Sequence, residues 1–144
     1  MHFQSLENLI LETFSLNGKL TRFGDHFTAP DGLSGSRWQI LGALYHSEFP
    51  LTSPQLAEKT GMTRQGMQKQ LNQLLEQGLL QLLENPHHKR SSQFTLSEKG
   101  VQLYEAITQR WIETATPWAE QFSQAELETA LSVLARFAQL LPKV

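Results

Sequence analysis

The sequence of 144 residues contains no cysteine. Disulfide bonds, thiolate catalysis and peroxide sensing through a thiol are therefore excluded, as is a zinc finger built on cysteine ligands. Long hydrophobic runs are also missing, because Lys19, Arg22 and Asp25 interrupt the first apolar segment. The N-terminus lacks a basic segment followed by an apolar core. We therefore expect neither a membrane span nor a signal peptide, and the simplest location is the cytoplasm.

Net charge is low, at −2, but it is unevenly distributed along the chain. Residues 51–97 carry five basic and three acidic side chains, whereas residues 1–50 and 98–144 each have a net charge of −2. A concentration of positive charge in the middle of the chain favours contact with phosphates there. The composition, 40% hydrophobic and 18% charged, is typical of a globular protein of one domain.

Motifs for catalysis are lacking as well. The chain has no Ser-His-Asp order with a nucleophile turn, no glycine-rich phosphate loop and no paired-carboxylate motif, so we expect neither an enzyme nor a cofactor. Adjacent His87 and His88 raise the possibility of a metal site. Neighbours in a loop seldom point at one ion, and no further ligand lies at suitable spacing, so a solvated loop is the favoured interpretation.

What the chain does contain is helical periodicity. Amphipathic helices are expected over residues 5–27, with a possible bend at Gly18, and from Ser34 or Ser36 to before Pro50. A helix begins at residue 97 and bends or ends near Pro117, and a capping box at residues 123–126 opens the last one. The apolar side chains expected inside are Trp38, Leu41, Leu44, Tyr45, Val101, Tyr104, Ile107, Trp111, Ile112, Leu127, Leu131, Leu134, Phe137 and Ala138.

Residues 51–100 carry the most informative pattern. Ser53-Pro54 opens a short helix by cap and first-turn chemistry, and Gly61 supplies a tight turn. Thr63 caps the next helix, which runs to Gly78 with Met67, Leu71, Leu74 and Leu75 on its apolar stripe. Residues 79–84 and 93–97 are strand candidates around a basic tip. This order predicts a winged helix-turn-helix, whose second helix fits the DNA major groove.

The sequence resembles the MarR family of bacterial transcriptional regulators over nearly its whole length. One matching segment is LAEKTGMTRQGM at residues 56–67, continuing as LLEQGLL at residues 74–80. The other is FTLSEKG at residues 94–100, close to the family's leucine, threonine, two variable residues and glycine. The resemblance implies a mainly α fold with a small β-hairpin, in which N- and C-terminal helices form a dimerisation layer.

Under that resemblance the chain is one domain over residues 1–144. Residues 34–97 would form the winged helix-turn-helix part, and residues 1–28 and 98–144 the helical dimerisation part. Apolar stripes at both ends of the chain are compatible with a homodimer, although such stripes alone are more often intramolecular core.

Candidate DNA contacts lie on the exposed side of the second helix and at the wing tip. Gln65 and Gln68 are expected to reach base edges, since glutamine bonds adenine bidentately. The family's wing reads aspartate-arginine-arginine, with an arginine entering the minor groove; His88, Lys89 and Arg90 stand at the matching positions, so the acidic brace is replaced. The alternative for the helix is an ordinary solvated face. The candidate set is Ser53, Thr63, Arg64, Gln65, Gln68, Lys69, Asn72, Lys89 and Arg90.

A pocket for a small aromatic or amphipathic effector is a further expectation, because resembling proteins bind such molecules between the dimer layer and the DNA-binding part. The alternative is that aromatics at helical spacing simply form core. The candidate residues are His26, Trp38, Tyr45, His46, Tyr104 and Trp111.

These observations predict a homodimeric, ligand-responsive repressor that binds a pseudopalindromic operator on double-stranded DNA. Two alternatives stay open: a winged-helix adaptor that binds proteins and not DNA, and a small metal- or cofactor-dependent enzyme that uses the aromatic region.

Overall fold

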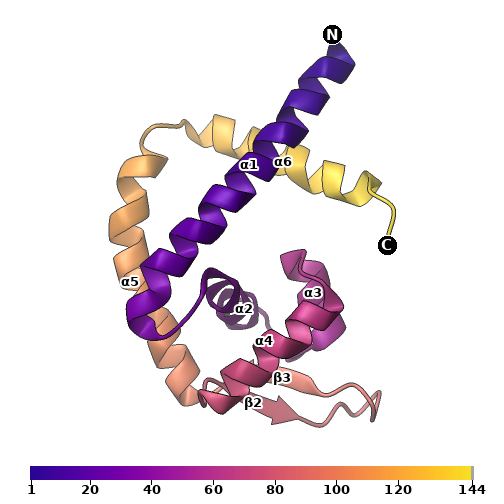
Figure 1. The fold of residues 1–144 in the computed structure, drawn as a ribbon, viewed down its shortest axis with the longest axis vertical. Coiled ribbons are helices and arrows are strands. Elements are labelled where there is room, and N and C mark those ends of the chain that lie inside the picture. Colours follow the sequence, from indigo (N-terminus) through magenta and orange to yellow (C-terminus); the bar gives the residue numbers. More distant parts are fainter. Residues whose placement is uncertain (144) are drawn as a thin grey trace. The chain divides into compact units, whose positions relative to one another are not determined.

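The computed structural model describes residues 1–143 and divides the chain into two compact units. The first unit is Met1–Ile107, and the second begins at Thr108. The first contains two helices, a helix-turn-helix and a three-stranded sheet, followed by the start of a further helix (Figure 1).

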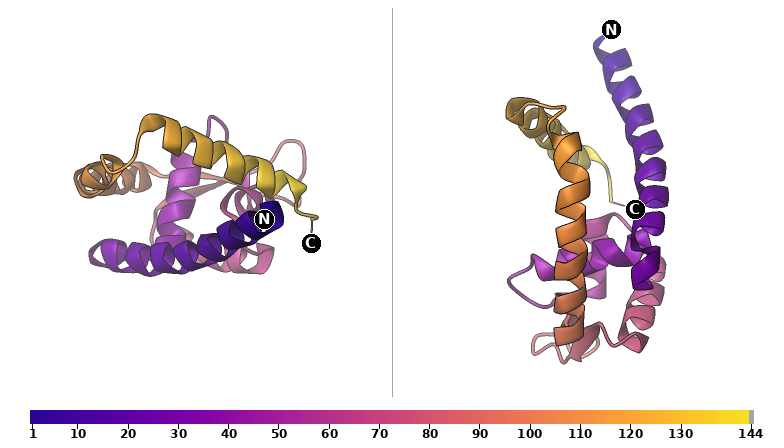
Figure 2. Two further views of the ribbon diagram at one scale, coloured as in Figure 1. Left: turned by 90° about the horizontal axis from the view of Figure 1, so that it is seen from above. Right: turned by 90° about the vertical axis from the view of Figure 1, so that its left-hand side faces the viewer.

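The first helix, α1, runs unbroken over His2–Thr28 (Figure 2). It begins earlier than periodicity predicted and continues through Gly18 without a break. A single glycine in a helix interior costs about 1 kcal/mol and need not break it. The expected loop after α1 contains a short 3-10 helix, η1 (Ala29–Asp31), which ends at Gly32 with φ 74°.

The second helix, α2 (Gly35–Tyr45), is capped by Ser34, whose hydroxyl accepts a hydrogen bond from the Arg37 amide. It crosses α1 with almost no side chain between the backbones, since a Cβ at Gly24 would lie 3.0 Å from Gly35 Cα. The Asp25 carboxylate accepts a 2.7 Å hydrogen bond from the Gly35 amide, a favourable place for negative charge at a helix N-terminus. α1 and α2 therefore cross with their backbones close together, and the hydrogen bond between Asp25 and the Gly35 amide links the two helices.

A three-stranded antiparallel sheet completes the first unit, in the order β1-β3-β2. The hairpin strands β2 (Leu80–Leu83) and β3 (Gln93–Leu96) were predicted from sequence, and Leu80 pairs with Leu96. Strand β1 (Leu51–Thr52), which pairs with β3, was not predicted. Because β3 lies between β1 and β2, it connects the wing to the residues that lead into the helix-turn-helix.

The core of the first unit lies between α2, the helix-turn-helix and the sheet. Trp38 is only partly buried, and Tyr45, which was expected inside, is 38% exposed. The last residue of α2 thus points to the surface, while Ile40 in the middle of the helix is buried instead. The largest fully buried side chains are Ile40, Leu41, Leu56, Met67, Leu71, Leu74, Leu79, Ile107 and Thr28.

Helix α5 (Glu98–Ala119) begins in the first unit and continues into the second, where α6 (Gln124–Leu140) follows it. Pro117 lies within the final turn of α5, so the helix ends shortly after it. The capping box predicted for α6 is present: Ser123 Oγ accepts from the Glu126 amide, and the Glu126 carboxylate accepts from the Ser123 amide. The expectation that Leu127, Leu131 and Leu134 lie inside is wrong for the single chain, where they are 46%, 69% and 44% exposed.

Over residues 1–143, none of the helices combines the length and apolar character that crossing a membrane requires.

Candidate nucleic-acid interface

The helix-turn-helix is built from α3 (Ser53–Thr60) and α4 (Arg64–Glu76). Thr52, and not Ser53, is the N-cap of α3: its hydroxyl accepts from the Gln55 amide, and the Gln55 side chain accepts from the Thr52 amide. The expected cap was therefore one residue late. Ser53 occupies the first helical position, so its hydroxyl is not used as the cap.

The turn between the helices depends on Gly61, which has φ 74° as the sequence predicted. Thr63 then caps α4 by accepting a 3.0 Å hydrogen bond from the Gly66 amide. Gly66 is suited to this cap, because a Cβ there would lie 2.9 Å from Thr63 Oγ1. The start of α4 is thus fixed by local chemistry.

Helix α4 presents opposite faces to the core and to the surface. Met67, Leu71 and Leu74 are fully buried. Gln68 and Asn72 are exposed on the other side and are joined by a 3.0 Å hydrogen bond from Gln68 Nε2 to Asn72 Oδ1. Polar residues 65, 68, 69 and 72 therefore share a surface that the helix can offer to a partner.

The wing tip is organised by short-range hydrogen bonds, one to a side chain and one between backbone groups. Asn85 Oδ1 accepts from the His87 amide at 3.0 Å, and the Ser91 amide donates to the His88 carbonyl at 3.1 Å. Arg90 is exposed, and within residues 1–143 the structure gives it no carboxylate partner. This agrees with the replacement of an acidic brace by His88.

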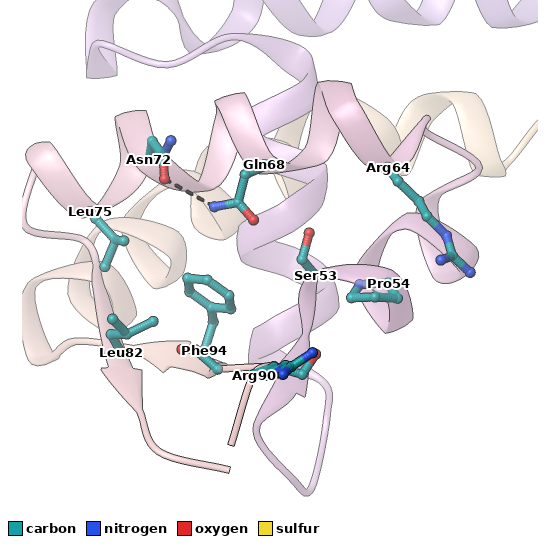
Figure 3. Close-up of a pocket in the computed structure, with 11 residues that line it drawn as sticks. Ser53, Pro54, Arg64, Gln68, Asn72, Leu75, Leu82, Arg90 and Phe94 are labelled. Carbon is teal, nitrogen blue, oxygen red and sulfur yellow. Dashed lines mark hydrogen bonds between the residues drawn. The ribbon is translucent and has the colours of Figure 1, made fainter. Parts of the chain in front are cut away.

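A cleft of about 430 Å³ separates α4 from the wing. In Figure 3, Gln68, Asn72 and Arg64 come from α4, while Phe94 and Leu82 come from the strands below them. Ser53 and Pro54 close one end, and Arg90 lies at the wing side. The floor is apolar and the rim is polar, with two arginines that attract anions to it. The remaining lining residues are Leu75, Ser91 and Ser92.

Of the nine predicted DNA contacts, the cleft brings together Ser53, Arg64, Gln68, Asn72 and Arg90. Thr63 is exposed but serves as the α4 cap, and Gln65, Lys69 and Lys89 are exposed outside the cleft lining. Sequence reasoning did not select the other lining residues. The only signal for Ser91 and Ser92 was their place directly after the basic tip.

The predicted effector residues separate into several places. Tyr45, His46 and Tyr104 form one cluster: the tyrosine ring centroids are 4.8 Å apart, and Tyr104 Oη lies 3.4 Å from His46 Nε2. Trp38 packs against Phe27 with centroids 5.4 Å apart, and His26 is exposed on α1. Trp111 belongs to the second unit, where it meets Trp118 edge-on.

The Tyr45 hydroxyl donates a 2.8 Å hydrogen bond to the Glu105 carboxylate. This bond, with smaller contributions from partial burial and from the charge of Glu105, raises the pKa of Tyr45 above its ordinary value of 10.0. Within residues 1–143, no three His, Asp or Glu side chains gather in a way that could hold a metal ion.

Comparison with known proteins gives the family. A sequence model described as "MarR family" matches residues 31–91. Rv2011c, an uncharacterized protein of Mycobacterium tuberculosis (strain H37Rv), is 36% identical over 131 residues, covering 91% of this chain and 90% of that protein. The crystal structure of the MarR family transcription regulator SP03579 has a TM-score of 0.76 and 26% identity, covering 96% of this chain and 94% of that one. MepR of S. aureus, solved as a DNA complex, has a TM-score of 0.75 and 20% identity, covering 91% and 96% of the two chains.

The chain belongs to the MarR family. Its winged-helix fold is that of the family's structures, and members are transcription regulators rather than enzymes. The protein is accordingly a transcription regulator, which makes the enzyme alternative untenable.

Proposed function

We propose that this regulator is a ligand-responsive repressor that binds a pseudopalindromic operator as a homodimer. The observation that carries the proposal is the convergence of Ser53, Arg64, Gln68, Asn72 and Arg90, from α3, α4 and the wing, around one cleft. Amide side chains can read adenine in the major groove, and arginines neutralise phosphates or read guanine. This combination of groups suits a DNA duplex better than a protein surface.

In the proposed complex, α4 occupies a major groove, with Gln65 and Gln68 toward base edges. Thr63, Arg64 and Lys69 contact phosphates, and residues 85–92 of the wing reach the adjacent backbone or minor groove. Phosphate contacts set the register, whereas base contacts select the sequence. The net positive charge of residues 51–97 supports phosphate contacts by this part of the protein, because the rest of the chain has a net negative charge.

Dimerisation is proposed from the apolar side chains that each unit leaves exposed. On α1, Phe3, Leu11 and Phe14 are 73%, 61% and 73% exposed, and on α6, Leu131 and Leu140 are 69% and 78% exposed. Faces of this kind mark interaction surfaces in soluble proteins. Two copies of the chain that bury these apolar faces against each other would present two α4 helices to one side of a duplex.

The effector site is proposed at the cluster of Tyr45, His46 and Tyr104. Its rings and hydroxyls can contact a small aromatic or amphipathic molecule, and its residues come from α2 and α5. A ligand that separates these helices would change the spacing of the two reading heads. Titration with small aromatic carboxylic acids, followed by tyrosine fluorescence and by release of bound DNA, tests this part.

Selection of bound duplexes from a genomic fragment pool tests the main proposal. A palindrome with half-sites about one helical turn, roughly 10 base pairs, apart is expected. Gln68→Ala should relax selection at one position of each half-site, and Arg90→Ala should weaken binding with a smaller salt dependence. Gln81→Ala, an exposed wing substitution outside the cleft lining, is the matched control.

Failure of the wild-type protein to select any DNA would overturn the proposal in favour of the protein-binding adaptor. A site without two-fold symmetry would overturn the dimeric arrangement alone.

A further inference from the structure

The C-terminal end of the recognition helix α4 is tied to distant parts of the first unit by one side chain, that of Gln77. Gln77 is the C-cap residue of α4. Its amide nitrogen donates a 2.8 Å hydrogen bond to the Gly32 carbonyl, and its amide oxygen accepts a 3.1 Å hydrogen bond from Arg37 Nη1. Both ends of the amide are used, so its orientation is fixed from two sides.

The two partners lie at the junction of α1 and α2. Gly32 directly follows η1, which continues from the end of α1, and Arg37 lies in the first turn of α2. Arg37 is itself held, because its Nε donates a 3.2 Å hydrogen bond to Ser34 Oγ, the α2 cap. The end of α4 is thus bonded to the point where α1 passes into α2.

The backbone at the same position adds a third attachment. Lys99 Nζ, from the first turn of α5, donates a 2.9 Å hydrogen bond to the Gln77 carbonyl. An orphan carbonyl at a helix C-terminus is a favourable site for a cation. Residue 77 therefore connects α4 to the segment between α1 and α2, to α2 itself and to α5.

The hydrogen bonds at Gln77 restrain a different part of α4 from the one that the buried apolar side chains restrain. Met67, Leu71 and Leu74 hold the helix against the core, and Thr63 fixes its start. The last buried residue of this apolar stripe is Leu74, so the hydrogen bonds of Gln77 hold the helix beyond it. Asn72 lies five residues before Gln77, or about 7.5 Å along the helix axis, so a tilt at the end is passed to the polar side chains.

We propose that Gln77 is a positioning residue that fixes the C-terminal end of α4 to the α1–α2 junction. The inference rests on the proposed function, in which α4 reads the operator. Held in this way, Gln68, which is hydrogen-bonded to Asn72, meets base edges in one register. Because Gly32 follows α1, a displacement of α1 also reaches the recognition helix through this bond.

The test compares Gln77→Met with Gln81→Met in the full-length protein. Methionine keeps the length of the side chain and removes both hydrogen bonds, while Gln81 is exposed on β2 and has no side-chain hydrogen bond among the described residues. Affinity is measured for a duplex carrying the sequence that the wild type selects and for a scrambled duplex of equal composition. Gln77→Met should lower the ratio of the two affinities by about tenfold, because without the two hydrogen bonds the arrangement of α4 that reads the operator is a smaller fraction of the free protein. Gln81→Met should leave the ratio unchanged.

Gln77→Glu keeps the acceptor for Arg37 but loses the donor to Gly32, so it should reproduce the loss if the bond to Gly32 is the essential one. It also serves as the second variant if the methionine protein does not fold, which circular dichroism checks. A lower midpoint of thermal unfolding with an unchanged affinity ratio would mean that Gln77 only stabilises the fold, and would overturn the inference. Wild-type protein that discriminates no sequence would overturn the proposed function and this inference together.

Discussion

Gly100 illustrates how a single residue can decide whether two elements meet. It is buried at the start of α5, and a Cβ there would collide with the carbonyl oxygen and carbon of Leu79. The same carbonyl accepts a 3.0 Å hydrogen bond from the Ser97 amide. The backbone of Leu79, which follows α4, thus lies so close to α5 that only glycine fits at position 100, and this explains the glycine of the family motif.

We expect Gly100→Ala to destabilise the protein by about 2 kcal/mol, because backbone must move to admit the methyl group. Gly18→Ala is the matched control, since its Cβ would meet only the flexible Arg22 guanidinium at 3.5 Å. That substitution should stabilise α1 by roughly 0.5–1 kcal/mol through helix propensity. Urea unfolding measures the change in the free energy of unfolding for both variants. A change of the same sign in both would contradict the explanation.

Tyr45 gives a second prediction at this scale. Its hydroxyl donates to Glu105, which raises its pKa, so the contribution to stability is present below the ordinary tyrosine pKa and is lost as pH rises through the raised value. Glu105→Gln should lower the pKa of Tyr45 toward 10.0, because both the charge and the charged acceptor disappear. Ultraviolet titration of the phenolate measures this shift. An unchanged tyrosine titration would argue against the hydrogen bond.

Single-residue predictions from sequence succeeded where the reason was local. Gly61 and Gly78 both have φ 74°, and Thr63 caps α4, because turns and caps depend on the residue and its immediate neighbours. The roles of Gln77 and Asp25 could not be predicted in this way. Their partners are 45 and 10 residues away in the sequence, and nothing in a local pattern points to them.

At the scale of elements, α6 depends on its capping box. Hydrogen bonds from the Ser123 backbone and side chain lower the pKa of Glu126 below its ordinary value of 4.5. A lowered carboxyl pKa contributes stability that is present above the unfolded value and is lost as pH falls through the folded one. The N-terminal turn of α6 should therefore loosen below about pH 4.

Ser123→Ala is expected to raise the pKa of Glu126 and to destabilise the first turn of α6 by about 1 kcal/mol. Side-chain carboxyl titration by NMR measures the pKa, and amide hydrogen exchange measures the turn. Ser132→Ala, in the middle of α6, is the matched control and should leave the Glu126 titration unchanged. A Glu126 pKa that does not respond to Ser123→Ala would contradict the capping geometry.

Sequence patterns predicted the helices and the wing because these elements repeat a period over many residues. The pattern could not predict β1, which has two residues and exists only because it pairs with β3. It also placed the α3 cap at Ser53 instead of Thr52, since both residues are good caps and the choice depends on where β1 ends. At the candidate interface, the residue types were predictable, whereas their grouping around a cleft required the fold.

At the scale of the whole molecule, the exposed apolar faces of α1 and α6 are the dominant feature. They explain why residues predicted to be interior lie on the surface of a single chain. The helical periodicity of apolar residues identifies an apolar face, but it does not show whether the same chain or a second copy covers that face. A homodimer is the proposed solution.

Leu131→Glu should convert the proposed dimer to monomer, because burying an unpaired carboxylate costs several kcal/mol. Gln139→Glu adds the same charge to an exposed polar position of α6 and should leave assembly unchanged. Sedimentation velocity distinguishes the species. A wild-type protein that is monomeric at micromolar concentration would disprove the proposed assembly.

The order of strands has a consequence for a chain still being synthesised. Leu51 pairs with Phe94, so the sheet cannot close until residues of β3 have left the ribosome, long after α3 and α4 have emerged. Helices form from local contacts, but this pairing must first close a long loop. A nascent chain that ends before Gln93 would therefore carry both helices of the reading motif without the strand that joins them to the wing. Competence to engage an operator would be acquired late in translation, when the central strand is added.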